Sequence, residues 1–236
     1  MKDYGKDLGK SKMNGVELRH NFFDQNELKT FVDKINFLID TRDKVDPKKV
    51  DSSVFKKDFN DFYLDRNLGR IRINLKQKDI PSGIIRKLNE EAQKINPDLE
   101  LGIISFIRYD KQYGFVQLIP HYDKPSKVQF LFDIQVNSNV QWPLVVAEHG
   151  EYNMVDNDIL ILDVTKKIHW RKPQVFEDGQ FLDVMFVTFN NKNMEIGSAD
   201  DHDSNVKPYY DEYKEYADSI YPPYMHKCYQ RILKVW

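Results

Sequence analysis

Apolar residues recur at helical spacing in two stretches of the N-terminal half of the chain. Over about 24–41 an apolar residue follows every three or four positions, and the same period returns after Pro81. An apolar stripe with this period predicts an amphipathic helix. The sequence Asn-Pro-Asp at 96–98 ends the second helix, because proline cannot continue the backbone hydrogen bonds. A weaker stripe at the same period favours a further helix over 55–64.

From residue 101 the pattern changes to short apolar or alternating runs separated by turn residues, and an alternating run over 70–75 precedes them. The runs lie at 101–109, 115–121, 128–136, 143–148, 159–163 and 181–189. Short strands at this spacing predict a sandwich or a barrel. The natural candidate is the double-stranded β-helix, the jelly roll that cupins use. The sequence therefore predicts an α+β fold with a cupin-like jelly-roll core and flanking helices.

The two ends of the chain differ from this core. Residues 1–15 are rich in Lys, Gly and Asp without an apolar period, so we expect a flexible N-terminal arm. Residues 207–236 are dense in tyrosine and predict a helical tail, with helices near 209–220 and 224–235. We therefore expect one domain over 16–236, with its β-helix core at about 101–190.

Composition narrows the class of protein. The chain of 236 residues is 41% hydrophobic and 31% charged, as is typical of soluble globular proteins. Its net charge of −2 gives no global reason to bind nucleic acid or an anionic membrane. Cys228 is the only cysteine, which excludes internal disulfides and fits a reducing compartment. The polar N-terminus lacks a signal-peptide core, and no apolar run approaches the ~18 residues of a membrane span. We expect a cytoplasmic protein, and the oligomeric state stays open.

Three residues stand in the order of a metal site. His121 and Asp123 follow an apolar strand-like run, and residues i and i+2 of a strand point to the same face. His169 follows after 169 − 123 = 46 residues, which is enough chain to cross a barrel and return. Two histidines and a carboxylate on one face of a metal are typical of non-haem Fe(II) oxygenases. The same ligands would also bind other divalent first-row metals.

Several motifs resemble, in order, the Fe(II)/2-oxoglutarate-dependent dioxygenase superfamily, most closely its prolyl-4-hydroxylase-like branch and relatives with a His-Trp-Arg motif. The motifs are Arg108-Tyr109, Pro120-His121-Tyr122-Asp123, the strand 128–136 with Asn137, Trp142-Pro143-Leu144, Asn157-Asp158-Ile159-Leu160 and His169-Trp170-Arg171-Lys172-Pro173.

The resemblance implies that His121, Asp123 and His169 bind Fe(II). It implies 2-oxoglutarate and O2 as cosubstrates and leaves room for ascorbate as a further cofactor. The implied reaction decarboxylates 2-oxoglutarate to succinate and CO2 and hydroxylates a substrate C–H bond. The substrate would be a peptidyl proline-type residue, a free amino acid or another small metabolite.

The chain departs from this branch where relatives hold the distal carboxylate of 2-oxoglutarate. Relatives carry a Lys or Arg about ten residues after the second histidine, whereas this chain has Asp-Gly-Gln-Phe-Leu at 178–182. We expect Arg171 to take this role, because it shares a face with His169 on an extended strand and its planar guanidinium matches a carboxylate. Tyr109 would add a hydroxyl hydrogen bond. The alternative cations are Lys127 and Arg108.

Two other functions stay open. A cupin-like protein could bind a metal or small ligand without 2-oxoglutarate chemistry, although such proteins commonly use additional histidines that this chain lacks at strand spacing. A non-catalytic jelly-roll interaction module would leave His121, Asp123 and His169 without a common role. A nucleobase substrate would want a basic, aromatic groove, and the nearly neutral charge argues against it.

Overall fold

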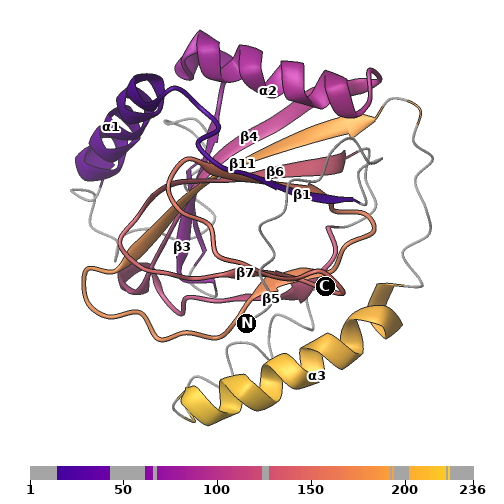
Figure 1. Ribbon diagram of the computed structural model, residues 1–236. Helices are drawn as coiled ribbons and strands as arrows, with labels where there is room; N and C mark the ends of the chain where they lie inside the picture. The colour runs from indigo at the N-terminus through magenta and orange to yellow at the C-terminus, as the bar shows by residue number, and fades with distance from the viewer. Residues whose placement is uncertain are drawn as a thin grey trace.

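The computed structural model is an α+β protein built on two antiparallel sheets (Figure 1). It describes residues 15–42, 62–65, 68–123, 128–191, 193, 202–221 and 223. Buried apolar side chains from both sheets meet between them. Two sheets that bury one apolar face each against the other form a stable two-layer core. The predicted jelly-roll core is therefore confirmed.

The larger sheet has the strand order β1-β9-β6-β11-β4-β3-β2. Its strands are β1 (Val16–Arg19), β2 (Phe62–Asp65), β3 (Arg70–Leu75), β4 (Leu99–Asp110), β6 (Val128–Ser138), β9 (Asp158–Asp163) and β11 (Phe181–Asn191). The smaller sheet has the order β5-β10-β7-β8. Its strands are β5 (Leu118–His121), β7 (Leu144–Val146), β8 (Gly150–Tyr152) and β10 (His169–Arg171). The central strands β9-β6-β11-β4 and the smaller sheet together make the double-stranded β-helix.

The helices cover the outer faces of the sandwich (Figure 1). Helices α1 (Gln25–Arg42) and α2 (Ser82–Ile95) lie on the larger sheet, and α3 (His202–Ile220) lies beside the smaller one. Two short 3-10 turns, η2 (Gln77–Asp79) and η3 (Lys111–Tyr113), join neighbouring elements. None of the described helices is long and apolar enough to cross a membrane.

The larger sheet is apolar on both faces, and strand alternation divides its residues between two cores. On β4, Ile104 and Phe106 face the helices, whereas Ile107 and Tyr109 face the smaller sheet. Strand β9 behaves alike, with Ile161 toward the helices and its neighbours in sequence toward the smaller sheet. The helices cover one face of the larger sheet, and the opposite face packs toward the smaller sheet.

Most predicted elements are confirmed, and the exceptions have physical causes. The helix expected over 55–64 is wrong at residues 62–64, which belong to β2, and the rest of this range lies outside the described residues. Strand β2 pairs with β3 through backbone hydrogen bonds that override a weak local period. The expected strand 143–148 ends at Val146, where a turn leads into β8. Helix α3 begins before the expected residue 209. The expected helix near 224–235 and almost all of the arm lie outside the described residues, so the division into an arm and one domain stays a prediction.

Removing a buried side chain from the helix-facing core should destabilise the fold. Ile161 is fully buried, so we expect Ile161→Ala to lower the free energy of unfolding by about 2–5 kcal/mol through lost burial and a cavity. Urea denaturation measures this change. The control Ile103→Ala removes the same atoms from a side chain that is 51% exposed, and should cost less than about 1 kcal/mol. Equal losses would contradict this assignment of the core.

The buried carboxylate of Glu91 on α2 should give stability a dependence on acid. Burial raises its pKa, but hydrogen bonds from Lys94 and Arg19 outweigh burial and leave the pKa below its usual value. A carboxyl with a lowered folded-state pKa stabilises the protein above its unfolded pKa, and this contribution is lost as pH falls through the folded-state pKa. We expect Glu91→Gln to flatten the acid limb of stability against pH. The exposed Glu90→Gln should keep the slope of the wild type.

Candidate metal centre

The pairing of two short strands brings the predicted metal ligands together. In the antiparallel ladder between β5 and β10, His121 lies opposite His169, and their ring centroids are 4.3 Å apart. Asp123 follows β5 by two residues, and its Oδ1 lies 3.8 Å from Nε2 of His121. One ligand atom from each of the three residues can be chosen so that all lie within 4.8 Å of one another. This spacing suits three ligands that share one face of a metal ion.

Backbone carbonyls orient both imidazole rings. Nδ1 of His121 lies 2.7 Å from the carbonyl oxygen of Ile119, and Nδ1 of His169 lies 3.1 Å from that of Lys167. When Nδ1 carries the proton and donates it to the carbonyl, the lone pair of the neutral ring is on Nε2. Metal-binding histidines commonly hold their second nitrogen in this way. Both rings are therefore set to present Nε2 as the ligand atom.

The surroundings favour neutral imidazole at His121. Burial and the neighbouring His169 together lower its pKa to about 4, although the carboxylate of Asp123 acts to raise it. The positive charge of Arg70 is a smaller influence in the lowering direction. A histidine must be deprotonated to bind a metal. Near neutral pH, His121 therefore has no proton to lose before it coordinates.

Arg171 follows His169 by two residues on β10 and is fully buried. It lies in the layer of side chains between the two sheets, which we call the inner wall. Its Nη1 donates to the carbonyl oxygen of Trp142, and its Nη2 lies 3.5 Å from Oδ2 of Asp133 on β6. Burial raises the pKa of Asp133, whereas Arg171 and His169 act to lower it. Asp133 is a functional candidate that the sequence analysis did not single out, although it lies within the strand 128–136.

Tyr109 is also fully buried, and its ring packs edge-on against Trp142 at 5.2 Å between centroids. Its hydroxyl accepts a hydrogen bond of 3.0 Å from Nη1 of Arg70 on β3. Arg70 is a second cation beside the site, with a side chain 16% exposed, that the sequence analysis missed. A signal was present in the alternating sequence of β3, because placing Ile71 and Ile73 against the helices turns Arg70 and Arg72 to the opposite face, toward the smaller sheet.

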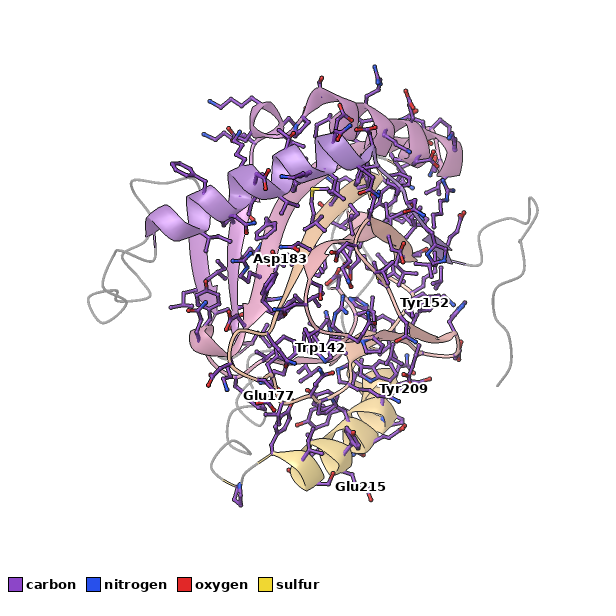
Figure 2. The ribbon with its side chains drawn as sticks, turned by 60° about the vertical axis from the view of Figure 1, so that its left-hand side comes forward. Trp142, Tyr152, Glu177, Asp183, Tyr209 and Glu215 are labelled. Carbon is purple, nitrogen blue, oxygen red and sulfur yellow. The ribbon has the colours of Figure 1, made fainter. Side chains whose placement is uncertain are left out.

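Of the two alternative cations, Arg108 does not reach this site. Arg108 points to the opposite face of the larger sheet, where it binds Asp183 at 2.7 Å and Asn36 of α1 at 2.7 Å. Figure 2 shows Asp183 near the helix layer and Trp142 between the two sheets. Lys127 lies outside the described residues. Of the predicted residues, the structure therefore brings together His121, Asp123 and His169, with Arg171 and Tyr109 on the inner wall.

Comparison with known proteins places the fold. The sequence matches no protein-family model and no curated protein. A prolyl-4-hydroxylase from Pseudomonas putida is similar in structure, with 12% identity and a TM-score of 0.53 over 76% of this chain and 94% of that one. For a prolyl 4-hydroxylase from Phytophthora capsici the values are 10% identity and 0.57 over 89% and 79%.

A third similar structure is HygX from Streptomyces hygroscopicus, which was solved with nickel, 2-oxoglutarate and hygromycin B bound. It has 11% identity and a TM-score of 0.50 over 81% of this chain and 95% of that one. At these identities the comparison establishes the architecture. The chain therefore has the double-stranded β-helix fold of prolyl 4-hydroxylases and related 2-oxoglutarate oxygenases, and the resemblance predicted from its sequence is confirmed in its fold.

Proposed function

We propose that the protein is a non-haem Fe(II)- and 2-oxoglutarate-dependent dioxygenase that hydroxylates a C–H bond of its substrate. The observation that carries the proposal is the meeting of His121, Asp123 and His169 across β5 and β10, with ligand atoms within 4.8 Å of one another. Two imidazoles and one carboxylate are a ligand set that suits Fe(II) and leaves coordination positions for a cosubstrate and O2.

The inner wall fits a dicarboxylate cosubstrate as well. Two buried arginine atoms lack a hydrogen bond to the described residues: Nε of Arg171, and Nε of Arg70, which lies 3.5 Å from a carboxylate oxygen of Asp65. Buried donors of this kind are costly unless a ligand or water satisfies them.

Each residue has a separate role in the proposed reaction. His121, Asp123 and His169 hold the metal, and the carbonyls of Ile119 and Lys167 keep the two rings in place. Tyr109 and Arg171 line the inner wall beside the proposed 2-oxoglutarate site. Once bound, iron, 2-oxoglutarate and O2 supply the oxidation that yields succinate, CO2 and a hydroxylated product. Buried apolar side chains around Trp142 would keep water away from the inner end of this site.

The substrate is proposed as a peptidyl residue or a small molecule. The support is similarity of fold to prolyl 4-hydroxylases and to a protein solved with hygromycin B bound. A role in the cytoplasm is proposed from the single cysteine, which fits a reducing compartment. We also propose that residues 16–236 act as one domain.

Removing one ligand should abolish metal binding. We expect His169→Ala to weaken Fe(II) binding at least about 100-fold, because two remaining ligands cannot hold the metal on one face. Calorimetry under anaerobic conditions measures this, and bound iron after gel filtration confirms it. The control His20→Ala alters an imidazole that is 64% exposed and lies beside Asp158 at the far edge of the larger sheet, so its affinity for iron should equal that of the wild type.

Anaerobic titration of the Fe(II)-loaded protein with 2-oxoglutarate should produce the weak visible charge-transfer band of bidentate chelation. We expect the band in the wild type and its loss in His169→Ala. Iron binding without a band would favour the cupin-like alternative. No iron binding at all would contradict the metal centre and favour an interaction module.

A further inference from the structure

We infer that Arg70 on β3, together with Tyr109 on β4, receives the distal carboxylate of 2-oxoglutarate. This inference rests on the proposed function and adds a residue that the resemblance does not supply. It concerns the departure noted in the sequence, where residues 178–182 contain no cation.

The register of the larger sheet explains why the cation comes from β3. Of the residues 178–182, only Leu182 is buried, and it packs in the core between the sheets. Leu182 lies opposite Tyr109 in the ladder between β11 and β4, and Tyr109 lies opposite Arg70 in the ladder between β4 and β3. Leu182, Tyr109 and Arg70 therefore lie side by side on three neighbouring strands, β11, β4 and β3. Where relatives carry a cation on β11, this chain has Leu182, and its positive charge lies two strands away on β3.

The geometry of Arg70 suits an anion at the hydroxyl of Tyr109. Its Nη1 donates to that hydroxyl at 3.0 Å, and its side chain is only 16% exposed. A guanidinium offers five N–H donors in a planar fork. Nε is buried and lies 3.5 Å from Oδ2 of Asp65 without forming a hydrogen bond. A carboxylate placed beside Tyr109 would accept hydrogen bonds from both the guanidinium of Arg70 and the hydroxyl of Tyr109.

A tight turn holds Arg70 close to the strand that carries His121. Gly69 has a positive φ of 55°, and a side chain there would meet the backbone of Val116 at 2.5 Å. Its carbonyl accepts a hydrogen bond of 3.0 Å from the amide of Asp110. The close approach of Gly69 to Val116 packs the start of β3 against the segment that precedes β5.

The partners of the two arginines separate their roles. Arg171 is fully buried, and it lies beside Asp133, whose side chain is 1% exposed. Removing Arg171 from such a pair would leave a buried charge without compensation. Arg70 lies 3.5 Å from Asp65, a carboxylate that is 33% exposed. An ion pair that solvent screens is weak, so a ligand carboxylate can replace Asp65 at little cost in free energy. Arg171 is thus a contact within the wall, and Arg70 is the cation available to pair with the ligand.

The test compares two 2-oxo acids on the anaerobic Fe(II)-loaded protein. 2-Oxoglutarate and 2-oxobutanoate chelate iron through the same 2-oxo acid group, but only the first has a distal carboxylate. The visible chelation band gives the affinity for each without turnover. We expect the wild type to bind 2-oxoglutarate about 100-fold more tightly. Arg70→Met should weaken 2-oxoglutarate about 10- to 100-fold, as loss of a charge-assisted hydrogen bond does, and leave 2-oxobutanoate unchanged.

The matched control is Arg72→Met, which removes the same group from the same face of β3. Arg72 donates to Asn74 and Ser105, so we expect neither affinity to change. Tyr109→Phe removes only the hydroxyl and should weaken 2-oxoglutarate about 3- to 10-fold without affecting 2-oxobutanoate. This variant keeps the inference testable if Arg70→Met does not fold.

The outcomes separate the inference from the proposed function. No band with either acid in the wild type overturns the proposed function and the inference with it. Bands with both acids and an unchanged preference in Arg70→Met overturn the inference alone. The same holds if Arg72→Met loses the preference equally, or if Arg171→Met abolishes the preference while Arg70→Met keeps it.

Discussion

The antiparallel pairing of β5 with β10 is the constraint on which the candidate site depends. The ladder sets His121 opposite His169, and the turn after β5 brings Asp123 beside them. A slip of one residue in this register would turn one histidine to the outer face of the sheet. The neighbouring strand β7 pairs with β10 on its other side and fixes it in place. A strand of three residues can thus hold a ligand precisely, because it is paired on both edges.

The larger sheet supplies the inner wall only because helices α1 and α2 cover its outer face. Alternate residues of β3, β4 and β11 point toward helices α1 and α2, so the residues between them face the smaller sheet. This alternation places Tyr109 inside and turns Arg108 outward to Asp183. Two neighbouring residues of one predicted motif therefore lie on opposite faces and have unrelated roles.

Buried charge distinguishes this inner wall from an ordinary apolar core. Arg171 and Asp133 lie within it, and Arg70 lies at its edge. Buried ion pairs seldom stabilise a fold more than apolar residues of similar size would. Their presence next to two paired histidines is better explained by binding of a charged ligand. The proposed dicarboxylate would place one end at the metal and the other between Arg70 and Tyr109.

The sequence alone determined the α+β class, helices α1 and α2 and most core strands, because these follow from local periods of 3.6 and 2 residues. The strand that was expected to carry both His121 and Asp123 ends at His121, and Asp123 lies two residues past it. The sequence did not reveal β2 or β10 as strands, since three or four residues carry too little pattern to outweigh their surroundings. Only the tertiary structure decided that His169 lies opposite His121, that Leu182 takes the inner position where a cation was expected, and that Arg70 reaches Tyr109 from β3. Each of these facts depends on the register between strands that are far apart in sequence, and hydrogen bonds between distant strands leave no local period to read.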